Sequence, residues 1–342
     1  MEMQSYIFGL RTWIDYLFKN SLDYTFYRRI INVFLRCINE SYMSKVKAWI
    51  SAARLRTLPL SVSGILTGSA AAYAGGFFKL PVFLLAIATT LGFQVLSNFA
   101  NDYGDGLKGT DNKDRVGPAR AFQSGLLKAR ELKRGMIMTT IITLLLASLL
   151  IFYAFGNENF LLSFIFFNLG IAAVIAAITY TVGRSAYGYR AMGDLFVFVF
   201  FGIVGVMGSY FLYSQSLGEH IVLPAITIGL LSTAVLNLNN MRDRISDAKV
   251  NKNTLAVILG PERVKFYHLA LIVIALFSTV VYLWLEFNGW PHFIPLIAFI
   301  PLLLNVIKVL KTKDATTLDP ELKKVALSTF LFSLLLFASN FI

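Results

Sequence analysis

Apolar and polar stretches alternate along this chain with a long, regular period. Windows of about 20 predominantly apolar residues follow one another, and shorter segments between them hold almost all the charged residues. A window of that length is enough for a helix to cross the hydrocarbon core of a bilayer. We therefore expect an all-α, polytopic membrane protein with nine transmembrane helices, over 57–77, 80–100, 136–156, 159–181, 193–214, 221–241, 266–286, 292–311 and 323–342.

Composition agrees with a chain whose main solvent is lipid. Of its 342 residues, 56% are hydrophobic and 15% are charged, whereas soluble domains carry about 25% charged residues. A single cysteine, Cys37, excludes a framework of disulfides within the chain. The net charge of +12 would suggest nucleic-acid binding in a soluble protein. In a membrane protein it points to topology and an anionic ligand, so we expect no nucleic-acid partner.

The placement of the basic residues predicts an orientation. Of the 31 Lys and Arg, 30 lie before the first window or in every second loop after it and at the borders of that loop, and only Lys79 lies on the opposite side. Basic loops stay in the cytoplasm, which puts the N-terminus there and the C-terminus across the membrane. Residues 1–44 mix aromatic and basic side chains, and they are interpreted as an N-terminal extension, either interfacial or upstream of a functional start at Met43. Residues 45–342 form the transmembrane domain.

Two windows end in clusters of Asn and Asp. The spacing of three or four residues puts each cluster on one helical face: Asn98, Asp102 and Asp105 after the second window, and Asn239, Asp243 and Asp247 after the sixth. By the charge pattern, both clusters lie at cytoplasmic helix ends. Carboxylates are costly near hydrocarbon, so such clusters mark a candidate site. Solvated loop starts would explain one cluster, but two clusters of matching spacing favour a shared function.

The two clusters predict a metal–diphosphate site. Carboxylate and amide oxygens suit hard cations such as Mg²⁺, which completes its shell with water and phosphate oxygens. Basic residues that could contact a diphosphate follow each cluster: Lys108, Arg115, Arg120, Arg242 and Lys252. Such cations neutralise the phosphate oxygens that the metal does not reach. The chain has no GxxxxGK[ST] loop, so nucleotide hydrolysis has no support.

Four separated segments resemble the UbiA superfamily of intramembrane aromatic prenyltransferases. They are AARLRTLPLS (52–61), NDYGDGLKGTDNKDRVGPARAFQSG (101–125), YTVGRSAYGYRAMGDLFVFVFFG (180–202) and NNMRDRISDAKVNKNTLAVILG (239–260). They are most similar to the menaquinone-pathway members, which prenylate 1,4-dihydroxy-2-naphthoate. The resemblance extends over about 45–342. The first motif departs from the family pattern at Gly109, where a third acid is common, and Asp111 stands two residues further on.

The resemblance implies a nine-helix bundle in the cytoplasmic (inner) membrane, two Mg²⁺ ions and a polyprenyl diphosphate donor. It implies a transferase that makes demethylmenaquinone from 1,4-dihydroxy-2-naphthoate with loss of CO₂ and diphosphate. Asn98 and the four carboxylates would hold the metals, and the five basic residues would contact the diphosphate. Arg54, or Arg56 in its place, would pair with the carboxylate of the aromatic acceptor. Tyr180 and Arg184 would line the cation site, since a Tyr face stabilises positive charge.

Other readings stay open on the sequence alone. A different acceptor, such as 4-hydroxybenzoate or homogentisate, would use similar metal clusters. A cation-coupled transporter would also carry intramembrane acids, although transporters often place them near the bilayer midplane on broken helices. Either Arg54 or Arg56 could serve only as a positive-inside anchor, and Tyr180 could belong to the interfacial aromatic belt.

Overall fold

The computed structural model of the protein describes residues 44–110, 117 and 120–342. Chain contacts define two units, Met1–Ser51 and Ala52–Ile342, and the helical bundle belongs to the second. In the described residues every regular element is a helix, and β-pairing is limited to one isolated bridge between Arg190 and Asn253. The predicted extension over residues 1–44 lies almost wholly outside the described residues.

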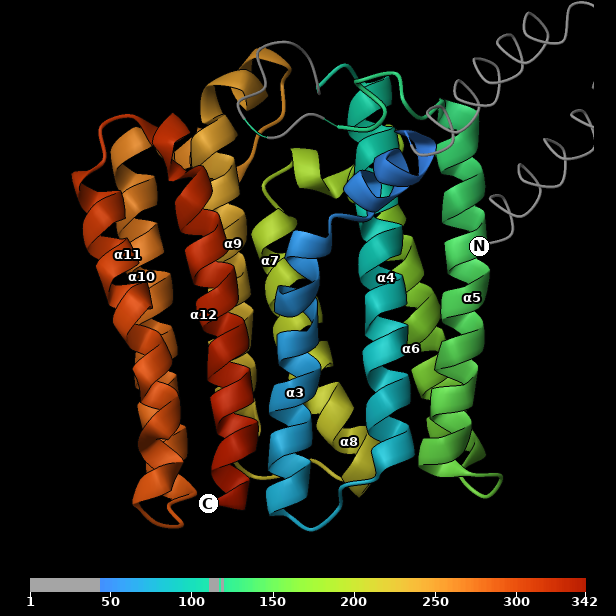
Figure 1. Ribbon diagram of the computed structural model, residues 1–342, viewed down its shortest axis with the longest axis vertical. Coiled ribbons are helices and arrows are strands. Elements are labelled where there is room, and N and C mark those ends of the chain that lie inside the picture. The colour runs from blue at the N-terminus through green and yellow to red at the C-terminus, as the bar shows by residue number, and fades with distance from the viewer. Residues whose placement is uncertain (1–43, 111–116, 118–119) are drawn as a thin grey trace, which may run out of the picture. The chain divides into compact units, whose positions relative to one another are not determined.

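The bundle runs through nine helical segments in the described part of the chain (Figure 1). The first four are single helices: α3 (Leu58–Ala74), α4 (Leu80–Leu107), α5 (Ala129–Phe155) and α6 (Phe160–Thr179). The fifth joins α7 (Gly193–Val197), a π-helical segment η3 (Phe198–Gly208) and α8 (Ser209–Ser214). Then come α9 (Val222–Lys249), α10 (Leu255–Leu285), η4 (Trp290–Ala298) with α11 (Phe299–Lys311), and η5 (Ala315–Leu318) with α12 (Asp319–Ala338) and η6 (Ser339–Phe341). Short 3₁₀ turns stand at η1 (Leu55–Thr57) and η2 (Tyr187–Tyr189).

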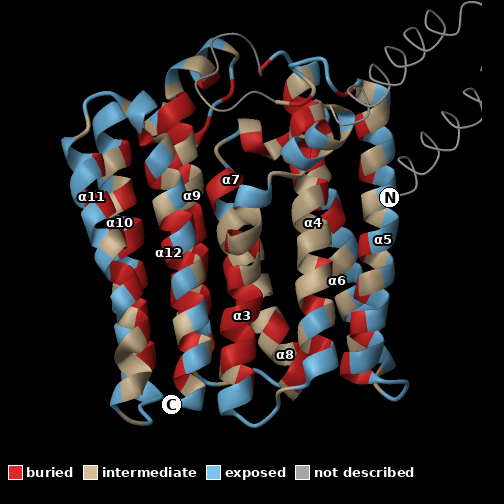
Figure 2. Cartoon of the chain, viewed as in Figure 1, coloured by how far each residue is buried: buried red, intermediate tan, exposed pale blue. Residues whose placement is uncertain are grey.

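Length and composition make this a multi-pass membrane protein. Eight of the segments in the described residues are long and apolar enough to cross a membrane. The ninth, α3, has 17 residues and is slightly shorter. Exposed positions run along the helices of the bundle (Figure 2), and many of them carry large apolar side chains. On α6 only 6% of the apolar window is buried. The predicted all-α polytopic fold is confirmed, with α3 as a shorter ninth span.

The helices extend beyond the apolar windows at the end that carries the polar clusters. Helix α4 continues to Leu107 and α9 continues to Lys249, so both Asn/Asp clusters lie on helix rather than on loops. Helix α5 begins at Ala129 instead of near 136, because the Glu131 carboxylate accepts a hydrogen bond of 2.8 Å from the Lys128 backbone N–H. A side chain that satisfies a free N–H in this way stabilises the first turn.

Two hydrophobic clusters hold the bundle together. One is built mainly from α9 to α12 and the other from α3, α4, α5 and α8. Helix α3 joins the two, since it packs against α12 on one side and against η3, α4 and α8 on the other (Figure 1). Gly68 permits this approach, because a Cβ there would lie 2.0 Å from the Ser209 Oγ and 2.3 Å from the Val206 carbonyl oxygen.

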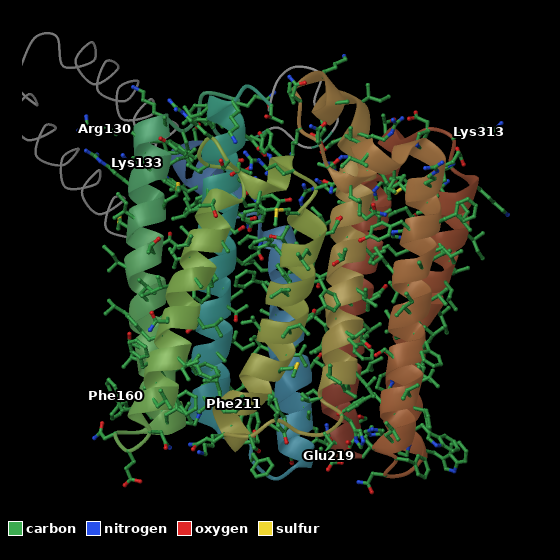
Figure 3. The ribbon with its side chains drawn as sticks, turned by 180° about the vertical axis from the view of Figure 1, so that it is seen from behind. Arg130, Lys133, Phe160, Phe211, Glu219 and Lys313 are labelled. Atoms are coloured by element: carbon green, nitrogen blue, oxygen red, sulfur yellow. The ribbon has the colours of Figure 1, made fainter. Side chains whose placement is uncertain are left out.

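The two ends of the bundle differ in charge. Arg130, Lys133 and Lys313 project at one end, and Phe160, Phe211 and Glu219 lie at the other (Figure 3). The basic end is the end at which α4 and α9 finish and at which both Asn/Asp clusters lie.

Candidate active site

A cavity of about 560 Å³ opens among α3, α4, α6, η3, α9 and α12. Along α4 its lining extends from Ala86 to Asp105, which is about 28 Å at 1.5 Å per residue. Its deeper walls are apolar and include Phe166, Phe200 and Leu212, whereas its mouth is lined by Asn, Asp, Arg and Lys side chains. The cavity therefore combines a charged mouth with a long apolar interior.

Both Asn/Asp clusters contribute to the mouth of this cavity. Asn98 and Asp105 reach it from α4, and Asn239 and Asp243 reach it from α9. The two carboxylates are 4% and 6% exposed, respectively. A buried carboxylate is strongly disfavoured unless it is paired and hydrogen-bonded, so the partners of each one define the electrostatics of the site.

Two arginines balance Asp102. Its Oδ1 lies 3.1 Å from the Arg54 Nη2 and 3.5 Å from the Arg120 Nη1. Both arginines line the cavity, whereas Asp102 lies behind them. The neighbouring Asn98 amide donates a hydrogen bond of 2.8 Å to the Ala53 carbonyl oxygen, which ties α4 to the segment before α3.

A tyrosine outside the Asn/Asp clusters holds Asp105. The Tyr189 hydroxyl, in η2, donates to the Asp105 Oδ1 at 2.8 Å and lies 2.5 Å from the Thr110 Oγ1. The ammonium groups of Lys108 and Lys252 lie 4.0 Å and 5.5 Å from the centre of the same ring. Burial, followed by the Asp105 carboxylate, raises the pKa of the Tyr189 hydroxyl, so it remains a protonated donor at neutral pH.

Arg242 joins the α9 cluster to α12. Its Nε and Nη2 donate to the two Asp243 oxygens at 2.8 Å and 2.7 Å, and its Nη1 donates to Asp319. Its Nη2 also donates to the Asn239 Oδ1 at 2.8 Å. The guanidinium is buried, and its charge is matched by two carboxylates. The structure thus places Arg242 as a partner of the acids, and it does not line the cavity.

Lys252 lies between the two clusters. Its ammonium is 3.5 Å from the Asp247 Oδ1, and the turn after α9 is closed by a 2.9 Å hydrogen bond from the Lys252 backbone N–H to the Asp247 carbonyl oxygen. Burial opposes the charge on Lys252, but the Asp105 and Asp247 carboxylates outweigh it and raise the pKa of the ammonium. One cation therefore interacts with an acid from each cluster, which shows that the two faces converge.

The family model of the UbiA prenyltransferases matches residues 61–335. The chain belongs to the UbiA prenyltransferase family. A Haemophilus influenzae protein named 1,4-dihydroxy-2-naphthoate octaprenyltransferase is 43% identical over 303 residues, which is 88% of this chain and 96% of the relative. The Escherichia coli protein of the same name is 39% identical over 87% of this chain and 96% of its own length.

A solved UbiA homologue has the same fold. The Archaeoglobus fulgidus structure bound to DMAPP and Mg²⁺ superposes with a TM-score of 0.56 at 18% identity, over 84% of this chain and 99% of that one. At that level of identity the similarity shows the fold alone and assigns no role to an individual side chain.

Not every residue predicted from the UbiA resemblance reaches the cavity. Tyr180 lines it, but Arg184 is exposed in the turn after α6 and is not among the lining residues. Arg115 and Asp111 lie outside the described residues. The structure adds residues that the sequence pattern did not mark: Tyr189, Thr110, Asp319 and Lys323.

The acids of the UbiA motifs fit a hard cation that is shared with a ligand. In the described part of the chain, no three His, Cys, Asp or Glu side chains gather closely enough to hold a metal alone. The donors are nevertheless all oxygens, and the buried Asp247 Oδ2 has no hydrogen-bond partner among the described residues. Mg²⁺ takes one or two carboxylates and completes its shell with water and phosphate oxygens, which suits this donor set.

Proposed function

We propose that this UbiA-family chain transfers a polyprenyl group from a polyprenyl diphosphate to 1,4-dihydroxy-2-naphthoate, releasing diphosphate and CO₂ and giving the quinol form of demethylmenaquinone. The observation that carries the proposal is the single cavity, in which both Asn/Asp clusters meet at the mouth of a long apolar interior. The names of relatives at 43% and 39% identity support the choice of acceptor.

The charged mouth fits the diphosphate headgroup. Asn98, Asp102, Asp105, Asp243 and Asp247 would hold Mg²⁺, and we propose two ions. Bound Mg²⁺ would stabilise the negative charge that develops on the leaving diphosphate. Arg120 and Lys252 line the cavity and would contact the phosphate oxygens that the metal leaves uncovered. Lys108, above the Tyr189 ring, would add positive charge nearby.

The apolar interior fits the isoprenoid chain and protects the reaction. When the allylic C–O bond breaks, its electron pair leaves with the diphosphate, and the remaining cation is destroyed by water unless water is excluded. Phe200 and Phe166 line the apolar interior, which would keep water away, and Tyr180 lines the same cavity, where its ring would stabilise positive charge.

The aromatic ring supplies the electrons for the new bond. The ring carbon that bears the carboxylate attacks the allylic carbon and forms a C–C bond. The bond to the carboxyl group then breaks, its electron pair restores the ring, and CO₂ departs. Because CO₂ leaves in place of a ring proton, the reaction needs no base to remove hydrogen from that carbon.

We also propose the orientation and the membrane. The motif end of the bundle carries the basic loops (Figure 3), and the positive-inside rule assigns this end to the cytoplasm. The water-soluble acceptor would then enter from the cytoplasmic face of the inner membrane.

The decisive experiment uses the full chain reconstituted in lipid vesicles with Mg²⁺, a polyprenyl diphosphate and 1,4-dihydroxy-2-naphthoate labelled in its carboxyl carbon. We expect one labelled CO₂ for each prenylated product. A lipid-soluble product that keeps the label, or transfer only to 4-hydroxybenzoate or homogentisate, would assign a different acceptor. Cation flux into the vesicles without any prenyl transfer would favour a transporter and refute the proposal.

A further inference from the structure

The first turn of α12 forms a wall of the cavity that no motif marks. Asp319, Leu322 and Lys323 line the cavity opposite α4, although they lie more than 70 residues beyond the second Asn/Asp cluster. Helix α12 packs against both α3 and α9, so its first turn stands beside the mouth. The position of this turn is what makes Lys323 a cavity residue.

Polar contacts fix this turn from two sides. On the α9 side, Asp319 accepts a hydrogen bond from the Arg242 guanidinium, which also donates to Asp243. On the other side, the Asn305 amide donates to the buried Glu321 carboxylate at 2.8 Å, and the Asn305 Oδ1 lies 2.8 Å from the His268 Nε2. A turn held at both sides, with a buried network on one of them, keeps its exposed side chain at a defined place.

Five cationic side chains line the cavity: Arg54, Arg56, Arg120, Lys252 and Lys323. Two of them differ from the other three in their partners. Arg54 and Arg120 are paired with Asp102, and Lys252 is paired with Asp247. Arg56 and Lys323 make no ion pair with any described carboxylate. Both are exposed, as cations that meet a ligand arriving at the mouth would be.

We propose that Lys323 and Arg56 bind the carboxylate of the aromatic acceptor, an inference that rests on the proposed function. The acceptor brings one carboxylate, which needs a cation that is not already matched by a protein acid. Arg56 lies in η1, two residues before α3 begins, and Lys323 lies near the start of α12, the helix that packs on α3. A carboxylate bound there leaves the naphthalene ring pointing inward, toward the apolar part of the cavity.

The sequence left the acceptor carboxylate to Arg54 or Arg56, and this placement selects Arg56. The Arg54 guanidinium is committed to Asp102 at 3.1 Å, so it positions the acid cluster instead of receiving the acceptor. The pair Lys323 and Arg56 would set acceptor specificity, whereas Arg120 and Lys252 would set donor binding.

Acceptor kinetics of the reconstituted full chain test this inference. For Lys323→Gln and for Arg56→Gln we expect the KM for 1,4-dihydroxy-2-naphthoate to rise about ten-fold, as expected for one charge-assisted hydrogen bond. The KM for the prenyl diphosphate should change less than about two-fold, because uniform binding of the other substrate is retained. Lys323→Arg should restore most of the acceptor affinity.

Two controls separate carboxylate recognition from general damage. Lys313→Gln removes a charge at the same end of the bundle but outside the cavity (Figure 3), and it should behave as wild type. With 1,4-dihydroxynaphthalene, which lacks the carboxylate, the Gln variants and the wild type should bind with equal affinity, measured by competition against the natural acceptor so that turnover of the analogue is not required. An unchanged KM for the naphthoate in the Gln variants, or a larger rise in the KM for the donor than in that for the naphthoate, would overturn the inference. The proposed function would still stand in that case, because it is tested by the activity of the wild type.

Discussion

Replacing Tyr189 separates two interactions that one side chain makes at the mouth of the cavity. Its hydroxyl donates to the Asp105 Oδ1 at 2.8 Å, and its ring lies beneath the ammonium groups of Lys108 and Lys252. Tyr189→Phe removes the contacts of the hydroxyl with Asp105 and Thr110 and keeps the ring, whereas Tyr189→Leu removes the ring contact as well. The change from wild type to the Phe variant therefore measures the hydroxyl contacts, and the further change from the Phe to the Leu variant measures the ring contact.

The structure sets the expected size of each effect. A hydrogen bond to a charged acceptor contributes about 1.5–3 kcal/mol, so Tyr189→Phe should lower kcat/KM for the prenyl diphosphate about ten- to hundred-fold. Each cation–π contact at a partly exposed site contributes about 0.5–1 kcal/mol. Tyr189→Leu should therefore lose about a further two- to five-fold for each lysine.

The assay is prenyl transfer in vesicles across a Mg²⁺ titration. We expect both variants to need more Mg²⁺ for half-maximal rate, because Asp105 is less well positioned. Tyr153→Phe, on the exposed face of α5 away from the cavity, provides the matched control and should be unaffected. Wild-type kinetics in Tyr189→Phe, or equal losses in the Phe and Leu variants, would refute the reasoning.

Three further outcomes are expected. Asp102→Ala and Asp243→Ala should each remove nearly all turnover while membrane insertion, followed by fractionation, is retained; substantial activity in either would contradict the metal assignment. Chelation with EDTA should abolish activity, and added Mg²⁺ should restore it. The helical circular dichroism should not change, because Arg and Lys already pair with the acids in the absence of metal. Loss of helix on chelation would show a structural metal instead. Gly104→Ala should lower stability by about 1–3 kcal/mol, because its Cβ would lie 2.5 Å from the Thr181 Oγ1; Gly170→Ala, which meets only Phe93 at 4.0 Å, is the control for thermal unfolding in detergent.

Helical periodicity was sufficient to locate the Asn/Asp faces. Residues spaced by three or four share a face, and the charge pattern put both faces at the same end of the bundle. The described cavity brings Asn98 and Asp105 together with Asn239 and Asp243. The shared helical face is a local relation and the shared end of the bundle depends on topology alone, so both can be predicted from a sequence.

Contacts between distant elements could not be predicted in the same way. The hydrogen bond from Tyr189 to Asp105 joins residues 84 apart, and that from Arg242 to Asp319 joins residues 77 apart. No period in the sequence relates such pairs. The sequence also assigned Arg242 to the diphosphate, because adjacency to Asp243 does not reveal that the guanidinium turns to hold that acid.

The central claim is that the two Asn/Asp faces act on one diphosphate headgroup. The most direct test measures the affinity of an unreactive prenyl thiolodiphosphate, with Mg²⁺ present, for Asp105→Asn, Asp243→Asn and the double variant in detergent. Because both acids serve the same ligand, the double variant should bind only slightly more weakly than the weaker single variant, with a coupling energy of about 1 kcal/mol or more. Losses that multiply independently would show that the two faces serve separate sites.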